Sequence, residues 1–346
     1  TILNLKKYGI TTKVITGDNQ YATQNICNLV GIEGDLLLGN EIDNMSDEVL
    51  YKKVETTTIF ARMNPMQKER IIQALRNNGH VVGYMGDGVN DAQSLHSADV
   101  GICVNTGADI AKESSDIILL EKSLKVIFDG VLEGRKVYAN IQKYMKLAIS
   151  SDFGDVFSIL IASIFLPFLP LLPIQMLIQD FLFQFSQIAI PYDKVDEEYI
   201  LKPKKWNTKN LGKFMLVMGI TSSIIDVIAF LIFWFILGYN SVQYEAYFQT
   251  AWFVECLISE TLIIHFIRTE KIPFIQSKAS NILMIMSTFT IIGTIIVPII
   301  LRNISEFHFV ILPAKFYLIV LALVFAYAVI TQFVKKLYIK KYHEWI

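Results

Sequence analysis

The sequence predicts two parts of different fold class: an α/β domain with a parallel sheet up to about Leu147, and an all-α bundle of membrane-spanning helices after it. Two observations lead to this expectation. Of the 346 residues, 53% are hydrophobic and the mean hydropathy is +0.43, which is too apolar for two or three ordinary soluble domains. The apolar residues are also unevenly distributed, because the runs before Leu147 are short and alternate with charged stretches, whereas long apolar runs dominate from Ala148.

Charge and cysteine content exclude other classes. With 31 Lys and Arg against 32 Asp and Glu, the net charge is -1, so no basic excess favours nucleic-acid binding. Intrinsic disorder is excluded because a disordered chain has a much lower hydrophobic content. The three cysteines are too few and too scattered for a disulfide framework or a zinc site, so we expect Cys27, Cys103 and Cys256 to be buried thiols.

Strand and helix patterns alternate in the first part. Apolar runs predict strands at residues 13–16, 58–61, 81–85, 100–104 and 116–119. Amphipathic stretches predict helices at 19–30, at 65–76 and in a short segment from Asn90. Strict alternation implies a parallel sheet, and ligands of such sheets bind at the carboxyl ends of the strands.

The second part contains six apolar windows of the length that a hydrocarbon core of about 30 Å requires. They are residues 147–166, 172–190, 214–237, 248–267, 282–301 and 316–333. The first two are joined by residues 167–170, which predicts a tight hairpin. One alternative remains open, namely that one of the six is a buried or re-entrant helix.

Basic residues are concentrated in alternate loops of this part. The loops after the second and fourth windows and the C-terminal tail carry Lys194, Lys202, Lys204, Lys205, Lys209, Lys213, Arg268, Lys271, Lys278, Lys335, Lys336, Lys340 and Lys341. The other three loops offer only Arg302 and Lys315. The positive-inside rule therefore places the α/β part, the two basic loops and the tail in the cytoplasm. We expect four regions: the α/β domain at 1–121, a stalk helix at 122–146, the membrane helices at 147–334 and a basic tail at 335–346.

Polar residues follow the predicted strands in patterns that suit phosphate chemistry. After the first strand, Thr16, Gly17 and Asp18 offer a hydroxyl and unhindered amides at a helix start, although an ordinary capped turn has the same composition. Lys68 lies in the first turn of the helix after the second strand, where it is either a charge-neutralising group or a solvated helix residue.

The run from Gly86 to Asp91 is more specific. Asp87 and Asp91 are two carboxylates four positions apart, Asn90 lies between them, and glycines allow close approach. These are the hard oxygen ligands that Mg²⁺ prefers, and an ordinary turn does not need both acids.

These segments carry a family resemblance. TGDN at 16–19, the segment 65–68 and MGDGVNDAQSL at 85–95 resemble the phosphorylation domain of P-type ATPases, which has the Rossmann-like haloacid dehalogenase fold. TGADIAKESSDIILL at 106–120 resembles the segment that leads into the stalk, and the six windows match the fifth to tenth membrane helices. The resemblance implies Thr16 as a phosphate-binding hydroxyl with Gly17 and Asp18 beside it, and Lys68 as the charge-neutralising lysine. It also implies Asp87 and Asp91 as ligands of a catalytic Mg²⁺, with Asn90 assisting.

One departure limits what this chain can do. The DKTGT motif, whose Asp is phosphorylated by ATP in the family, occurs nowhere in the 346 residues. We therefore expect the chain to be the C-terminal part of a longer pump and to form no phosphoenzyme alone. ATP is then bound mainly by a domain that this chain lacks.

Ionisable residues inside the predicted spans are expensive to insert and are therefore candidates for ion transport. Asp152 and Asp155 lie on one face of the first window, and Asp180 lies in the second with Gln184 one turn further. Because a hairpin joins the two windows, we expect these groups to converge near mid-membrane. Oxygen ligands favour Mg²⁺ or Ca²⁺ over copper or zinc, although interhelical hydrogen bonding is an alternative role.

Three more acids lie in later windows. Asp226 is in the third, and Glu255 and Glu260 are in the fourth, where they differ by about 140° around a helix, so at most one of them is expected to face the same site. His265, near Arg268, is expected to be interfacial.

Within the family, residues 150–173, 187–198 and 265–277 are similar to the bacterial magnesium transport ATPases. The resemblance implies ATP-driven Mg²⁺ import by an integral protein of the bacterial cytoplasmic membrane, with ATP, the cation and lipid as partners. The chain departs from that subfamily, which usually has Asn at the positions of Asp152, Asp155 and Asp180 and Asp at that of Gln184. The alternatives are a Ca²⁺ or proton pump and a non-catalytic membrane protein with a phosphatase-like regulatory domain.

Overall fold

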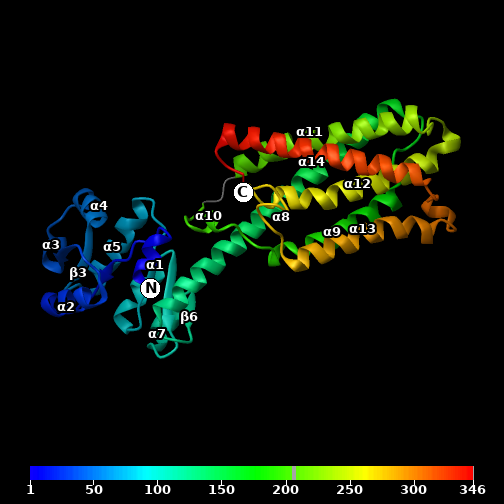
Figure 1. The fold of residues 1–346 in the computed structure, drawn as a ribbon. Coiled ribbons are helices and arrows are strands. Elements are labelled where there is room, and N and C mark those ends of the chain that lie inside the picture. Colours follow the sequence, from blue (N-terminus) through cyan, green and yellow to red (C-terminus); the bar gives the residue numbers. More distant parts are fainter. Residues whose placement is uncertain (205–207, 346) are drawn as a thin grey trace. The chain divides into compact units, whose positions relative to one another are not determined.

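The computed structural model describes residues 1–204 and 208–345, which form two compact units (Figure 1). The first unit is Thr1–Glu133 and the second is Gly134–Ile346. Lys205 of the basic loop and Ile346 of the predicted tail lie outside the described residues. Each unit has hydrophobic clusters of its own, so each is described by itself.

The strands of the first unit pair in parallel, as predicted, but they form two three-stranded sheets instead of one. The first sheet has the order β1 (Val14–Ile15), β3 (Thr57–Ala61), β2 (Asp35–Leu38). The second has the order β4 (Gly83–Met85), β5 (Val100–Val104), β6 (Ile117–Leu119). All five predicted strands are present, and β2 is an additional strand that the apolar pattern did not indicate.

The helices of the first unit begin and end at recognisable signals. They are α1 (Ile2–Lys7), α2 (Gln20–Val30), α3 (Gly39–Asp43), α4 (Asp47–Thr56), α5 (Pro65–Asn77), α6 (Ala92–Ser97) and α7 (Asp109–Glu113), with a 3-10 turn η1 (Val89–Asp91) before α6. Asn19 caps α2 by accepting from the amide of Tyr21 at 2.8 Å. The side chains of Asn64 and Gln67 cap α5 reciprocally, each at 2.9 Å from the other's backbone amide.

Three clusters of buried side chains hold this unit together. In β3, Ile59, Phe60 and Ala61 are fully buried, because helices cover both faces of a parallel sheet. Ile15 of β1 packs against both the cluster around Phe60 and the cluster around Tyr84 of β4. Ile15 therefore links the two clusters.

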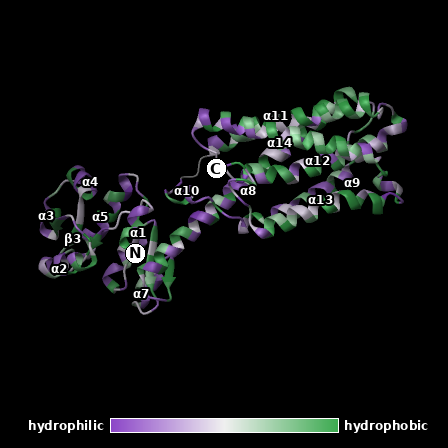
Figure 2. Ribbon diagram, viewed as in Figure 1, coloured by the Kyte–Doolittle hydropathy of each residue, from purple (hydrophilic) through white to green (hydrophobic). Residues whose placement is uncertain are grey.

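The second unit is a bundle of long helices with apolar residues along their lengths (Figures 1 and 2). Its helices are α8 (Leu124–Phe165), which starts in the first unit, α9 (Pro173–Gln187), α10 (Glu197–Ile200), α11 (Thr208–Leu231), α12 (Glu245–Ile267), α13 (Asn281–Leu301) and α14 (Ala314–Tyr342). Shorter turns are η2 (Ile190–Tyr192), a π turn η3 (Ile232–Ile236), η4 (Val242–Tyr244) and η5 (Ser305–Phe307). The stalk and the first predicted span are one unbroken helix, because α8 has 42 residues and a length of about 63 Å.

Among the described residues, five helices are long and apolar enough to cross a membrane: α8, α11 with its π turn, α12 with its 3-10 turn, α13 and α14. Five of the six predicted windows thus contain such a helix, and window 172–190 does not. There α9 has only 15 residues, or about 22 Å, against the roughly 30 Å of a hydrocarbon core. The helix starts at Pro173 and ends at Gln187, just before Pro191, so the apolar window includes turn residues.

Close packing fixes α8 against α11. A Cβ on Gly219 would lie 2.6 Å from Phe153 Cδ1 and 3.1 Å from the carbonyl oxygen of Ser150, so only glycine fits there. The hydroxyl of Ser223 donates to the carbonyl of Gly154 at 3.0 Å across the same crossing. Small residues thus let the two backbones approach closely, as is typical of membrane helices.

Candidate functional site

The segment after β1 is bound to the end of β3. The Thr16 hydroxyl donates to Asp18 Oδ2 at 2.9 Å and accepts from the Asp18 amide at 3.1 Å. The Met63 amide donates to the Thr16 carbonyl at 2.9 Å, and the Arg62 amide donates to the Asp18 carbonyl at the same distance. A Cβ on Gly17 would lie 3.3 Å from the carbonyl of Met63, which explains a glycine between the two polar residues.

Lys68 is bound to one of the paired carboxylates. Its Nζ lies 2.8 Å from Asp91 Oδ1, and the two side chains are only 12% and 13% exposed, so Lys68 is not a solvated helix residue. The Tyr84 hydroxyl donates to the same oxygen at 2.8 Å, and the Gly88 amide donates to Oδ2 at 3.2 Å. Burial tends to raise the pKa of Asp91, but the hydrogen bonds from Lys68 and Tyr84 outweigh it and hold that pKa below its ordinary value.

Asp87 and Asn90 are exposed at the same turn. Asp87 Oδ2 pairs with Lys122 Nζ at 2.9 Å, and both side chains are more than half exposed, so this ion pair is weak. A Cβ on Gly86 would lie 2.5 Å from the Cβ of Asp91, so the turn depends on glycine at this position. The two acids therefore have different surroundings: Asp91 accepts hydrogen bonds from Lys68, Tyr84 and Gly88, whereas Asp87 is exposed and open to a further ligand.

A buried polar group lies between α8, α9 and α12. Asp155, Cys256 and Glu260 each offer a ligand atom, and these atoms all lie within 4.8 Å of one another. The Cys256 thiol donates to Asp155 Oδ1 at 3.6 Å, and the Ser151 hydroxyl donates to Glu260. Gln179 of α9 contacts the thiol, with its Nε2 3.2 Å from Cys256 Sγ.

The other membrane acids lie in different surroundings. Asp226 is buried and accepts from the Ser158 hydroxyl at 2.6 Å and from the Trp252 indole at 3.3 Å. Glu255 is fully buried and accepts from Ser259 at 2.8 Å. Glu260 therefore belongs to the group around Asp155, whereas Glu255 has a partner of its own.

Asp152, Asp180 and Gln184 are exposed on the side of the bundle. Asp152 and Asp180 are near enough to repel each other electrostatically. Of the groups expected to converge between the first two windows, the structure places Asp155 in one group with Cys256 and Glu260. Asp152, Asp180 and Gln184 are exposed instead.

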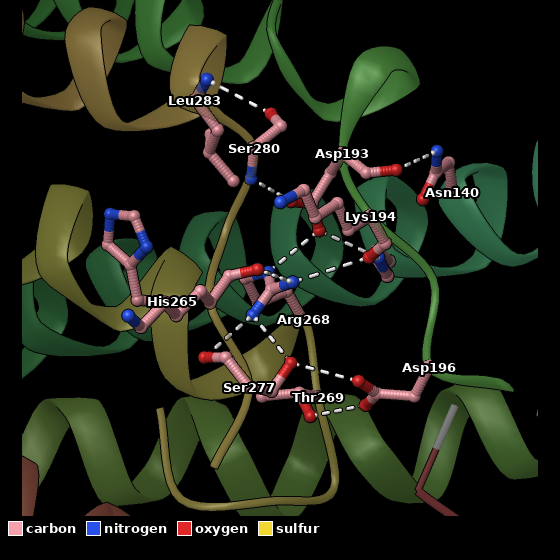
Figure 3. A network of polar contacts seen from close by, with 12 residues as sticks. Asn140, Asp193, Lys194, Asp196, His265, Arg268, Thr269, Ser277, Ser280 and Leu283 are labelled. Carbon is pink, nitrogen blue, oxygen red and sulfur yellow. Dashed lines mark hydrogen bonds and ion pairs between the residues drawn. The ribbon is translucent and has the colours of Figure 1, made fainter. Parts of the chain in front are cut away.

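The sequence did not indicate a buried ionic network at one end of the bundle (Figure 3). Asp193 Oδ2 lies 2.7 Å from both Lys143 Nζ and Arg268 Nε, and the Ser280 amide donates to Oδ1 at 3.0 Å. Burial tends to raise the pKa of Asp193, but the charges of Lys143 and Arg268 outweigh it and hold that pKa below its ordinary value. His265, expected to be interfacial, is buried nearby and lies 3.2 Å from the Ser287 hydroxyl.

Comparisons with known proteins agree with this arrangement of domains. Residues 1–99 match the haloacid dehalogenase-like hydrolases, and residues 168–337 match the C-terminus of cation transporting ATPases. These two parts in this order define the C-terminal portion of a P-type ATPase. The chain belongs to this family and is part of an integral membrane protein.

Individual relatives are more specific. The chain is 46% identical over 349 residues to magnesium-transporting ATPase, P-type 1, of Salmonella typhimurium, covering 99% of this chain and 38% of that protein. It is 47% identical over 339 residues to the Escherichia coli K12 protein of the same name, covering 98% of this chain and 38% of that protein. The calcium-transporting ATPase 1 of Bacillus cereus is 34% identical over 243 residues, covering 67% of this chain and 27% of that protein. The chain thus spans 38% of the length of the two magnesium-transporting relatives.

Proposed function

We propose that the complete protein imports Mg²⁺ across the bacterial cytoplasmic membrane, using ATP and an aspartyl phosphate formed upstream of Thr1. The observation that carries this proposal is a buried carboxylate group in a chain that is similar over almost its whole length to magnesium-transporting ATPases. The calcium-transporting relative matches less of the chain at lower identity, so Ca²⁺ is the second candidate.

In the α/β unit, the exposed carboxylate of Asp87 suits a catalytic Mg²⁺, because it pairs with an exposed lysine that a metal ion would displace easily. Bound there, the ion would neutralise charge on the phosphoryl group. The amide of Gly17 would donate a hydrogen bond to a phosphoryl oxygen, and so would the Thr16 hydroxyl once it turns away from Asp18 Oδ2. The Asp18 amide, which donates to Thr16 Oγ1, would hold that hydroxyl in place. Asp91 would act by holding Lys68 in place, and Asn90 would lie at the mouth of the site.

In the bundle, we propose that Asp155 and Glu260 bind the transported cation, because Asp155 is partly buried, Glu260 is buried and their oxygens can converge on one ion. Asp152, Asp180 and Gln184 form an exposed polar strip on α8 and α9 that would guide the cation to them. Asp226 and Glu255 would support this site from deeper in the bundle.

We also propose that the chain crosses the membrane six times, although α9 is short. Near the start of α9, the Gln175 side chain donates to the carbonyl of Phe307, between α13 and α14, at 2.8 Å. After η2, Asp193 accepts from the amide of Ser280, the N-cap of α13. Since α13 runs between these two ends, α9 with η2 runs beside it from one face of the bundle to the other.

The test is the cation dependence of ATP hydrolysis by the purified complete protein. Asp155→Ala should raise the Mg²⁺ concentration for half-maximal activity by about tenfold or more, since a ligand is lost. The matched control Glu306→Gln removes an exposed acid in the loop between α13 and α14 and should change nothing. Activity that follows Ca²⁺ instead of Mg²⁺ would favour the second candidate, and an unchanged ion dependence in both Asp155→Ala and Asp180→Ala would remove these acids from the transport site.

We expect the 346 residues alone to form no phosphoenzyme, because they lack the DKTGT motif. Acid-stable label from radioactive ATP on this chain alone would contradict that expectation. The sequence of the complete protein before Thr1 distinguishes a pump from a non-catalytic protein with a phosphatase-like domain. A DKTGT motif there supports the pump, and its absence supports the non-catalytic protein.

A further inference from the structure

A thiol lies among the carboxylates of the bundle. Cys256 is 3% exposed, Glu260 is 5% exposed, and their ligand atoms and that of Asp155 lie within 4.8 Å of one another. Sulfur is a soft ligand, whereas Mg²⁺ takes oxygen ligands in octahedral geometry and gains nothing from a thiol. Transport of a hard cation such as Mg²⁺ therefore does not explain the thiol in this group.

A fourth side chain completes the group. Gln179 is 5% exposed, its Nε2 lies 3.2 Å from Cys256 Sγ, and its Oε1 is buried without a hydrogen-bond partner. Because the two ends of an amide exchange by a simple flip, the oxygen can take the position facing the thiol. A buried oxygen without a partner, on a side chain that contacts the thiol, is available to a ligand that accepts electron pairs, namely a cation.

We propose that Asp155, Glu260, Cys256 and Gln179 form a binding site for a thiophilic divalent cation such as Cd²⁺ or Zn²⁺. Two carboxylate oxygens, one thiolate and one amide oxygen supply the four ligands that such ions take. On binding, the S–H bond of Cys256 breaks, a metal–sulfur bond forms and the proton leaves to solvent. One consequence rests on the proposed function: if Asp155 and Glu260 bind the transported Mg²⁺, a thiophilic cation held by the same residues would block Mg²⁺ transport.

The experiment uses Cd²⁺ and the purified complete protein. With Cd²⁺ bound, the wild-type protein should show a sulfur-to-cadmium charge-transfer absorption band in the ultraviolet. The Cys256→Ser variant should lack this band. Cys256→Ser should also weaken Cd²⁺ binding. Loss of a residue that only supports a metal ligand weakens binding by roughly 10- to 100-fold, and loss of the ligand Cys256 should cost at least as much. Cys27→Ser and Cys103→Ser are matched controls, because both are buried free thiols of the α/β unit, and both should keep the band. Gln179→Leu should keep the band and weaken binding by about tenfold.

A band that survives in Cys256→Ser, or that disappears in either control, overturns the inference. A measurement on the unaltered protein guards against a variant that fails to fold: Cd²⁺ should slow maleimide labelling of Cys256 by about tenfold or more, and an unchanged rate overturns the inference. The two proposals fail separately. Mg²⁺-dependent ATP hydrolysis without a Cd²⁺ band sinks this one alone, whereas a Cd²⁺ band in a protein whose hydrolysis ignores Mg²⁺ supports it and sinks the transport proposal.

Discussion

Asp193 joins segments that are far apart in the sequence. Its carboxylate binds Lys143, Arg268 and the Ser280 amide, which are 50, 75 and 87 residues away. Arg268 also donates to the Ser277 hydroxyl at 3.1 Å, and that hydroxyl donates to Asp196 at 2.9 Å, so a second acid balances the second cation (Figure 3). A buried charge is tolerated only with such compensation.

Replacing Asp193 by Asn should destabilise the bundle by about 3–5 kcal/mol at neutral pH, because it removes the charged group that both buried cations contact directly. The pKa of Asp193 is depressed in the folded state, so its contribution is present above about pH 4 and is lost as the pH falls through the folded value. The difference between variant and wild type should therefore shrink in acid. Equilibrium unfolding in mixed detergent micelles at several pH values measures it.

The control is Glu198→Gln in the same loop. Glu198 pairs with Lys271 at 2.9 Å, but the two side chains are 66% and 38% exposed, so its loss should cost less than about 1 kcal/mol. Equal effects of the two substitutions would mean that burial does not determine the strength of these ion pairs.

Sequence reasoning found some site residues and missed others for a physical reason. Lys68, Asp87 and Asp91 follow strands at short intervals, so local spacing indicates them. Gln179 and Asp193 acquire their surroundings only when separate helices pack, and nothing in the neighbouring residues marks them. Cys256 was correctly predicted to be buried, but its carboxylate neighbours lie on α8 and one turn along α12.

At the scale of elements, caps and periodicity predicted α2 and α5 well, because Asn19, Asn64 and Pro65 mark their starts within the local sequence. The short helices α3 and α7 and the strand β2 carry too few residues for a periodic signal. The length of α9 was overestimated because hydropathy counts apolar turn residues together with helical ones.

The crossing of α8 and α11 offers a test at this scale. Gly219→Ala should lower the stability of the bundle by about 1–3 kcal/mol, because the added methyl group meets the Phe153 ring and the Ser150 carbonyl. Gly212→Ala in the same helix places its methyl group in open space and should be neutral or slightly stabilising. Thermal unfolding of both variants in one detergent compares them directly, and equal midpoints would show that the helices do not cross this closely.

At the scale of the whole molecule, the sequence predicted the change from an α/β unit to a helical bundle because a change of solvent alters composition over many residues. It did not predict that the sheet divides into two, since pairing depends on contacts between strands that single windows do not contain.

Topology provides the prediction at this scale. With six crossings, cysteines introduced at Lys202 and Lys278 should react with an impermeant maleimide only after bacterial cells are permeabilised, whereas cysteines at Asn240 and Glu306 should react in intact cells. The native thiols are buried and should react much more slowly than the introduced cysteines. If α9 did not cross, Lys202 would lie on the same side as the loop at residues 167–170 instead of the opposite side.

The helix α12 has a consequence for how the protein is made. Of its apolar window, 83% is buried within the bundle, and it carries Glu255 and Glu260. During synthesis it emerges before α13 and α14 exist to shield these groups, at a time when each carboxyl facing lipid is costly. Membrane insertion of α12 is therefore expected to wait for its later neighbours, so that biogenesis of this half of the protein proceeds by groups of helices and not one helix at a time.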